Sequence, residues 1–280
     1  MSGKLAISNI GWPSEADGEA LALARDLGFN GIELAPTKVF GPLDESDDQT
    51  IVAYRDTMAE QGLRVPALQA ILFGVSGAHL FKSEAARVEL GVRLTRVAEI
   101  AGLLGAGACV FGSPGLRDPG DLAADEARDI AVAFFAGIAP RFADHGTTLA
   151  FEANPTIYNC GFVTRTLEAV ELVRQVATPG FGLQIDMGTV FANDEPDEAI
   201  AAAVPLAAHC HASEPGLVPL GSGGYDHARP AAALAKAGYE RWVSAEMKTT
   251  SDWQSAMRGA AEILHGKYDG EPRHEGKSAR

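Results

Sequence analysis

The sequence predicts a single-domain α/β protein, a (β/α)₈ barrel, on three observations. Short apolar runs alternate with longer Ala- and Leu-rich amphipathic segments, which is typical of parallel strands joined by helices. The cycle occurs eight times in 280 residues, the number and length of repeat that such a barrel needs. No Gly-x-Gly-x-x-Gly motif follows the first apolar run, which disfavours the competing doubly wound open sheet.

The eight expected strands are short apolar runs, too short to be independent helices. In chain order they are KLAISN (4–9), GIELAP (31–36), VPALQA (65–70), ACVFGSP (108–114), TLAFEAN (148–154), FGLQIDMG (181–188), AAHCHAS (207–213) and RWVSAEM (241–247). A glycine stands where six of the helices should stop, and we expect each to adopt the left-handed conformation that closes a helix. These glycines are Gly28, Gly62, Gly105, Gly146, Gly180 and Gly238.

Residues 1–265 are expected to form the barrel, with no internal domain boundary or low-complexity linker. Residues 266–280 lose the apolar periodicity and are rich in charge, Gly and Pro, so we expect a mobile polar tail there. No apolar stretch reaches the ~18 residues of a membrane helix, and the opening Met-Ser-Gly-Lys does not resemble a signal peptide. These features predict a cytoplasmic protein without a membrane partner.

The net charge argues against a nucleic-acid-binding protein, and the cysteine content argues against a disulfide-stabilised one. The net charge is −14, from 37 Asp and Glu against 23 Lys and Arg, which argues against a nucleic-acid partner because phosphate backbones are bound by basic surfaces. The three cysteines, Cys109, Cys160 and Cys210, have no Cys-x-x-Cys spacing and an odd number, so a disulfide framework is not expected.

Four potential metal ligands stand at the ends of successive late strands: Glu152, Asp186, His211 and Glu246. Their spacings of 34, 25 and 35 residues each match about one strand and helix with loops, so neighbouring strands would deliver them side by side. Three carboxylates and one imidazole suit Mn²⁺, Mg²⁺, Co²⁺ or Zn²⁺ better than a thiophilic ion. Any one acid could instead cap the following helix, but four together favour a metal site.

Polar residues at or just beyond the strand ends are the candidate substrate contacts. Asn154 and Lys248 stand two positions past Glu152 and Glu246, so they point to the same side if the strands continue. For each candidate, a structural hydrogen bond or a surface role remains the alternative, and His227 could also reach the site from its glycine-rich loop. The candidates are Glu33, Gln69, Arg117, Asn154, His209 and Lys248.

The motifs FEAN, QIDMG, HCHASE and SAEM, with the opening ISNIGWPSEADGEALALARDLGFNGIEL, resemble the xylose isomerase-like TIM barrel superfamily over about residues 5–265. The match is to its branch of ketose 3-epimerases and hydroxypyruvate isomerases. The resemblance implies that Glu152, Asp186, His211 and Glu246 bind one divalent ion, with Mn²⁺ favoured. It also makes Glu152 and Glu246 the catalytic acid/base pair, and it selects His211 rather than His209 as the ligand.

The resemblance implies a sugar isomerase or epimerase that acts on a sugar or sugar phosphate through a metal-stabilised enediolate. The residue types fit this chemistry, because a divalent ion stabilises the enediolate and a glutamate on either side of the substrate permits inversion. Barrels of this kind are often homo-oligomers, but no apolar stripe in the sequence identifies an interface.

The chain departs from the epimerase pattern at two positions. Thr189 and Leu217 stand where those enzymes carry a His and an Arg that contact substrate oxygens, so we expect another polyol, keto-sugar or sugar phosphate rather than a free ketose. A lyase or dehydratase acting on a keto-polyol or keto-sugar, and a non-catalytic sugar-binding barrel, are the alternatives. A phosphodiesterase of the endonuclease IV kind is disfavoured, because it needs more strand-end histidines than the seven His of this chain provide.

Overall fold

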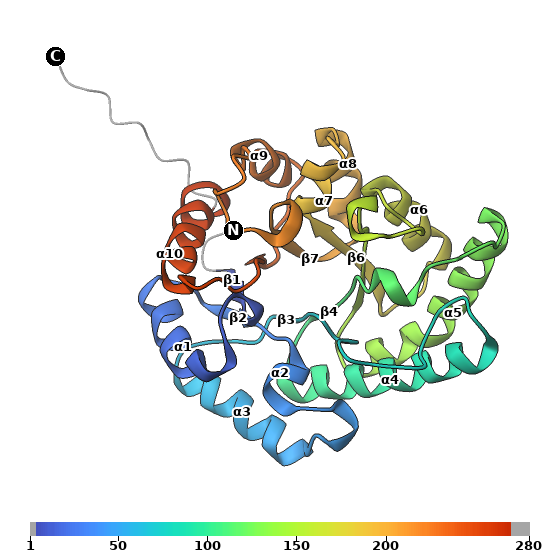
Figure 1. Ribbon diagram of the computed structural model, residues 1–280, viewed down its shortest axis with the longest axis horizontal. Coiled ribbons are helices and arrows are strands. Elements are labelled where there is room, and N and C mark those ends of the chain that lie inside the picture. Colours follow the sequence, from blue (N-terminus) through green and yellow to red (C-terminus); the bar gives the residue numbers. More distant parts are fainter. Residues whose placement is uncertain (1–3, 270–280) are drawn as a thin grey trace.

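The computed structural model describes residues 4–269 and has the predicted barrel, with eight parallel strands in the centre and helices around them (Figure 1). The strands are hydrogen-bonded in the order β2-β1-β8-β7-β6-β5-β4-β3, and isolated bridges from Gly31 to Arg64 and from Leu34 to Leu68 join the two ends. The strands are β1 (Leu5–Ser8), β2 (Gly31–Glu33), β3 (Ala67–Leu68), β4 (Ala108–Phe111), β5 (Leu149–Glu152), β6 (Phe181–Asp186), β7 (Ala207–Ala212) and β8 (Val243–Ala245).

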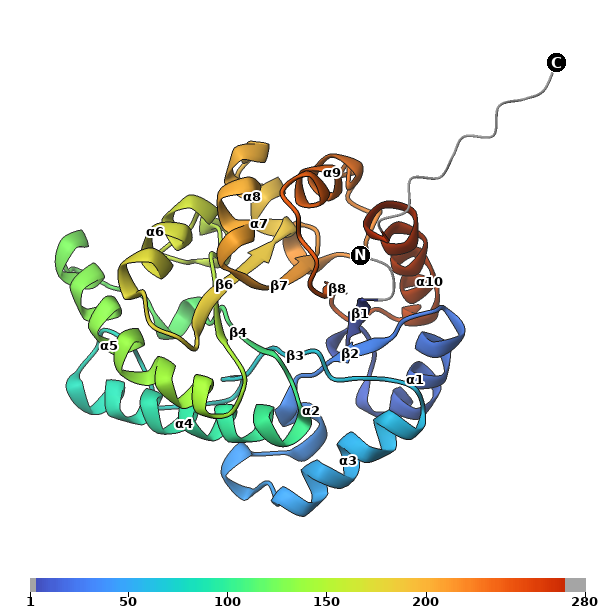
Figure 2. The ribbon, with the colours of Figure 1, turned by 180° about the vertical axis from the view of Figure 1, so that it is seen from behind.

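The helices form an outer ring around the strands, seen from both sides in Figures 1 and 2. Shorter helices such as α2 and α7 follow their strands directly, in the loops where each strand ends. The helices are α1 (Asp17–Asp26), α2 (Pro36–Phe40), α3 (Asp48–Glu60), α4 (Glu84–Leu104), α5 (Ala124–Asp144), α6 (Thr166–Val176), α7 (Met187–Ala192), α8 (Asp197–Ala203), α9 (Ala228–Lys236) and α10 (Trp253–Ile263).

Strand alternation separates two kinds of packing. Outward-facing Phe151 and Phe181 pack on Phe135 of α5, with ring centroids 5.4 and 4.8 Å apart. The small inward-facing residues Ala67, Ala108 and Ala150 form a separate cluster inside the barrel. Because side chains alternate along a strand, inward-facing Ala150 places Glu152 inward as well, at the carboxyl end of β5.

The chain continues past α10 in a π-helical turn, Leu264–Tyr268. Tyr268 is buried, and its hydroxyl lies 2.9 Å from His227 Nδ1. The predicted end of the barrel at residue 265 therefore falls inside this packed turn, and residues 270–280 of the predicted tail lie outside the described residues. In the part of the chain that is described, no helix combines the length and apolar character needed to cross a membrane.

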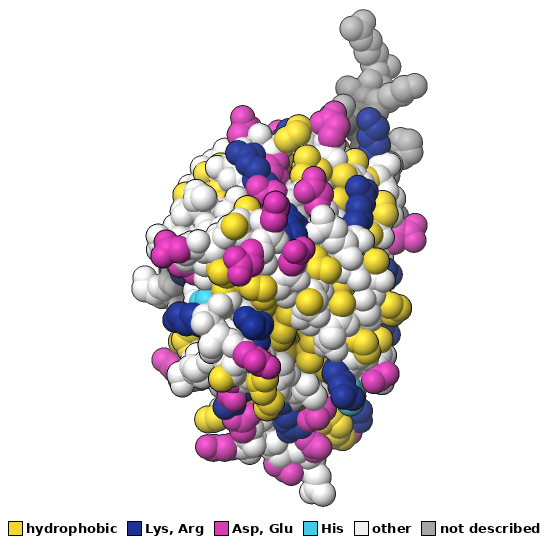
Figure 3. Space-filling view, turned by 90° about the vertical axis from the view of Figure 1, so that its right-hand side faces the viewer, with side chains coloured by type: hydrophobic (Ala, Val, Ile, Leu, Met, Phe, Trp, Pro, Cys, Tyr) yellow, Lys and Arg dark blue, Asp and Glu magenta, His cyan; other side chains and the backbone are white. Residues whose placement is uncertain are grey.

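The surface mixes charges of both signs. On the face shown in Figure 3, Lys and Arg side chains are interspersed with Asp and Glu, and apolar side chains lie between them. Basic residues do not gather into a continuous area on that face, in keeping with the net charge of −14.

Five of the six predicted helix-ending glycines lie one or two residues past a helix and have positive φ, as Gly62 does after α3 (φ 75°). The prediction that Gly180 ends a helix is wrong, because α6 ends at Val176 and Ala177 adopts the left-handed conformation that closes it. Gly180 also has positive φ (91°), but its distinctive constraint is proximity to α5. A Cβ atom there would overlap the carbonyl oxygen of Ala139 and lie 2.8 Å from Ala143 N.

Gly180→Ala should therefore destabilise the barrel by about 3 kcal/mol or more, because a left-handed backbone and an overlap with α5 are combined at one site. Gly62→Ala is the matched control: it has positive φ but nothing within 4 Å of the added methyl group, so it should cost about 1–2 kcal/mol. Urea unfolding midpoints measure both losses. Equal losses would mean that α5 moves aside freely.

Candidate metal centre

Four side chains from four neighbouring strands converge at the carboxyl end of the barrel. Glu152, Asp186 and His211 lie on β5, β6 and β7, and Glu246 directly follows β8. Each offers a ligand atom within 4.8 Å of the others. His211 Nδ1 lies 3.1 Å from Glu246 Oε2 and 3.3 Å from Glu152 Oε1. The spacing predicted from the sequence therefore does bring these four residues together.

Glu33 orients the imidazole of His211 from the side of the ring opposite the other carboxylates. Glu33 Oε1 on β2 lies 2.8 Å from His211 Nε2, and both side chains are fully enclosed. With the proton on Nε2 donated to Glu33, the lone pair of Nδ1 faces the other carboxylates, which is the arrangement that metal-binding histidines adopt. Burial raises the pKa of Glu33, but the nearby His211 and His209 outweigh this effect and hold the pKa below its ordinary value.

His209 belongs to this supporting layer. Its Nε2 lies 2.8 Å from Ser244 Oγ and 3.5 Å from Glu33 Oε1. Burial lowers the pKa of His209 to about 4, so the ring is neutral at pH 7. Glu33, His209 and His211 are also close enough to one another to hold an ion. However, their side chains are at most 1% exposed and contact one another, so we interpret Glu33 and His209 as residues that position His211.

Asp186 combines helix capping with its place in the quartet. Its carboxylate accepts hydrogen bonds from Gly188 N (3.3 Å) and Thr189 N (2.8 Å) at the start of α7, and Ser213 Oγ donates to it as well. These bonds fix the orientation of the carboxylate. Burial, and then the charge of Glu152, raise the pKa of Asp186. Burial likewise raises the pKa of Glu246, against the effect of His211.

Glu152 is held by an amide and a guanidinium. Asn154 Nδ2 donates to Glu152 Oε2 (2.8 Å), and Arg117 Nη2 donates to both Asn154 Oδ1 (2.7 Å) and the Glu152 carbonyl (2.8 Å). The Arg117 guanidinium also lies 4.6 Å from the centre of the Phe151 ring. The remaining oxygen, Glu152 Oε1, is buried without a hydrogen-bond partner and faces His211 Nδ1.

This donor set fits a divalent cation. Three carboxylates and one imidazole nitrogen supply hard and borderline ligands at converging positions. Burial lowers the pKa of His211, but Glu246 and Glu33 outweigh this effect and raise the pKa well above its ordinary value, so an ion would replace the proton on Nδ1. The unpartnered Glu152 Oε1 supports the fit, because buried oxygen atoms are normally satisfied by a donor, a water or an ion. Glu152, Asp186, His211 and Glu246 would be the residues that hold it.

A cavity of about 550 Å³ opens onto the quartet, which we call the metal-side cavity. Of the expected substrate contacts, Asn154 and Gln69 line it. Glu33, His209 and Arg117 do not: they are buried behind its wall and hydrogen-bonded to protein groups, so the expectation of direct contact is corrected. Lys248 is exposed and lies outside the lining, so its contact with substrate stays a prediction.

The cavity wall includes two residues that were not expected from the sequence, Tyr158 and Gly112, whereas His227 does not reach the cavity. Tyr158 lines the cavity, and its hydroxyl accepts a hydrogen bond from Gly216 N (2.7 Å), which joins the loops after β5 and β7. Gly112 lies against the quartet, since a Cβ there would stand 2.6 Å from Glu152 Oε2. His227 is instead buried between Glu214 and Tyr268. The rule that barrel sites form from loops after the strands could have identified Tyr158.

The two departures from the epimerase pattern lie at the site. Leu217 lines the metal-side cavity and brings an apolar surface there. Thr189 is buried, and its hydroxyl lies 2.8 Å from both Asp186 Oδ2 and the carbonyl oxygen of Ala153. Neither position presents a cationic group to the cavity.

Fold and site together define a (β/α)₈ barrel with a carboxylate and histidine cluster at the ends of its last four strands. The sequence model described as "Xylose isomerase-like TIM barrel" matches residues 21–266, and the chain belongs to this family. This confirms the family indicated by the strand-end motifs. No curated protein matches the chain in sequence.

Solved structures, two sugar epimerases among them, share the fold at low sequence identity. A D-psicose 3-epimerase determined in the presence of D-fructose superimposes with a TM-score of 0.80 at 18% identity, covering 95% of this chain and 100% of that one. The 3-keto-D-glucoside 4-epimerase YcjR from E. coli gives 0.76 at 17%, covering 94% and 99%. The IOLI protein with a bound zinc atom gives 0.74 at 18%, covering 95% and 98%.

Gly112→Ala should weaken Mn²⁺ binding about tenfold or more while the fold survives, because the added methyl group displaces the side-chain end of Glu152 and crowds the amide of Asn154 without meeting any backbone. Gly115→Ala is the control, since nothing lies within 4 Å of its added methyl group. Isothermal titration of both variants with Mn²⁺ measures the effect. Equal affinity of the two variants for Mn²⁺ would mean that the position of the Glu152 carboxylate does not affect metal binding.

Proposed function

We propose that this protein is a divalent-metal-dependent sugar isomerase or epimerase. The observation that carries the proposal is the approach of two glutamates, from β5 and from the end of β8, to the same nitrogen of His211 beside the metal-side cavity. A carbonyl sugar in this cavity would have a carboxylate from each of two strands within reach of its carbon skeleton. Binding alone would not need two such groups.

The quartet would hold one divalent ion, and its three carboxylates favour Mn²⁺, with Mg²⁺, Co²⁺ and Zn²⁺ as other candidates. When bound, such an ion polarises the sugar carbonyl and stabilises the negative charge that develops on its oxygen. Glu33 would keep His211 in the ligating tautomer, and the bonds to Ser213 and to the start of α7 would keep Asp186 in place.

Glu152 and Glu246 would move the proton. One carboxylate removes a proton from the carbon next to the carbonyl, and the same or the other glutamate returns one. Return to the opposite face of that carbon inverts it, while return to the neighbouring carbon exchanges aldose and ketose. The bond from Asn154 to Glu152 Oε2 would hold this carboxylate in place beside the substrate.

The substrate class is a sugar that carries a carbonyl group. Structural neighbours include a D-psicose 3-epimerase determined with D-fructose, a 3-keto-D-glucoside 4-epimerase and a D-allulose 3-epimerase in complex with D-allulose, which supports this class. Leu217 and Thr189 give the cavity no cation for the oxygens that a free ketose presents, which favours a modified keto-sugar. We also infer a cytoplasmic location, with which three free buried cysteines agree.

Chelator-treated protein should gain thermal stability on titration with Mn²⁺, because an ion that binds only the folded state stabilises it by about 2.7 kcal/mol at a hundredfold excess over Kd. His211→Ala and Asp186→Asn should lose this gain, and Asn at 186 can still cap α7. Melting temperature against Mn²⁺, Mg²⁺, Co²⁺ and Zn²⁺ is the measurement. A flat response of the wild type would refute the metal site.

Glu152→Gln and Glu246→Gln should each reduce turnover by about 100-fold or more while remaining folded, because an amide cannot exchange the proton. Exposed Glu171→Gln on α6 is the matched control and should keep wild-type activity. Deuterium uptake from D₂O into a panel of keto-sugars, followed by NMR, reports the proton transfer directly. Substantial uptake in either site variant would remove that glutamate from the acid/base role.

A further inference from the structure

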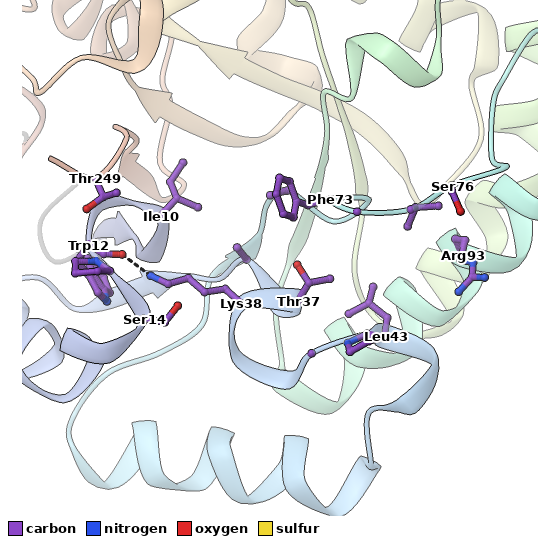
Figure 4. Close-up of a pocket in the computed structure, with 17 residues that line it drawn as sticks. Ile10, Trp12, Ser14, Thr37, Lys38, Leu43, Phe73, Ser76, Arg93 and Thr249 are labelled. Atoms are coloured by element: carbon purple, nitrogen blue, oxygen red, sulfur yellow. Dashed lines mark hydrogen bonds between the residues drawn. The ribbon is translucent and has the colours of Figure 1, made fainter.

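A second cavity of about 710 Å³ adjoins the metal-side cavity, and Ile10 and Ala70 line both. We call it the outer cavity. It lies between the turns after β1, helix α2 and the loop after β3. In Figure 4, Ile10 and Phe73 lie across this space from Lys38, Thr37 and Leu43. A single sugar ring at the quartet would leave the outer cavity empty.

The lining of the outer cavity is mainly apolar. Trp12, Leu43 and Val75 contribute to its walls, and Phe73 lies at its edge with 76% of its surface exposed. No other large apolar side chain in residues 4–269 is as exposed as Phe73. An exposed aromatic ring beside an apolar cavity is typical of a binding surface.

The basic residues of the outer cavity already have partners. Lys38 Nζ donates to the carbonyl oxygens of Trp12 (2.7 Å) and Asn9, and it lies 5.2 Å from the centre of the Trp12 ring. Arg93 is paired with Glu89 (2.7 Å) and with Asp44. Lys38 is held by main-chain carbonyls and Arg93 is ion-paired, so the apolar residues dominate the lining and the cavity favours an apolar ligand.

The junction of the two cavities has a strained backbone. Ala70 has φ of 49°, a left-handed conformation that residues with a Cβ rarely adopt. Such strain persists where the surrounding structure enforces it, and it is concentrated at ligand sites. Ala70 directly follows Gln69, which lines the metal-side cavity, so the strained residue lies where a ligand would pass from one cavity to the other.

From these observations we infer that the outer cavity binds the aromatic aglycone of a glycoside whose sugar ring occupies the metal-side cavity. The inference rests on the proposed function and narrows its substrate class to keto-glycosides with an aromatic substituent. Phe73, 76% exposed at the edge of the outer cavity, supplies a surface on which an aromatic ring packs favourably. Ile10 and Ala70 border the path of the glycosidic bond.

Binding of three probes to the Mn²⁺-loaded full-length chain tests this: methyl β-D-glucopyranoside, phenyl β-D-glucopyranoside and cellobiose. Isothermal titration should show about tenfold or greater preference for the phenyl glycoside over the other two, from burial and packing of its ring. Phe73→Ala and the cavity-filling Thr37→Trp should remove most of this preference. Val92→Ala, 57% exposed on α4 and outside both cavities, should retain it.

Equal affinity for the phenyl and methyl glycosides, or no detectable binding of either, would overturn the inference. A preference for cellobiose would overturn it in favour of a second sugar ring. A phenyl preference that survives in both Phe73→Ala and Thr37→Trp would place the aromatic group elsewhere. Because these are binding measurements, they are independent of the deuterium uptake from free keto-sugars, whose failure would refute the proposed chemistry alone.

Discussion

Three carboxylates enclosed at one end of a barrel repel one another, and the rest of the site depends on how this repulsion is balanced. Glu152 and Glu246 approach His211 Nδ1 from two sides, and Asp186 is held by donors at the start of α7. Burial of unpaired charge is costly, so such a cluster persists only with neighbouring donors or a cation. The barrel accepts this cost at the strand ends and recovers stability from the apolar packing between its strands and helices.

The supporting residues act at a distance from the cavity. Arg117 is buried among carbonyl oxygens of the loops after β4 and β5, and it fixes the amide of Asn154 that in turn fixes Glu152. Glu33 performs the corresponding task for His211 from β2. These contacts are made between groups whose own positions are set by strands or by several hydrogen bonds, so the ligand atoms are oriented before an ion binds. Such orientation of the ligands by a second layer commonly decides metal affinity.

The barrel divides its tasks between its two halves. Strands β5 to β8 carry the quartet, while the loops after β1, β2 and β3 form the outer cavity. Loops at the carboxyl ends can vary without disturbing the strands, which explains how one barrel can combine a shared reaction centre with a particular recognition surface. Ile10 and Ala70 lie where these two surfaces meet.

The eight strands and the quartet could be predicted from the amino-acid sequence, because strand alternation and the common direction of parallel strands fix where strand-end residues such as Glu152 meet. The sequence could not separate cavity residues from those behind the wall: Arg117 and Asn154 are both polar and near strand ends, and only their neighbours decide which one faces the cavity. The close approach of Gly180 to α5 and the outer cavity also required the tertiary structure, since both arise between segments distant in sequence that share no periodic pattern.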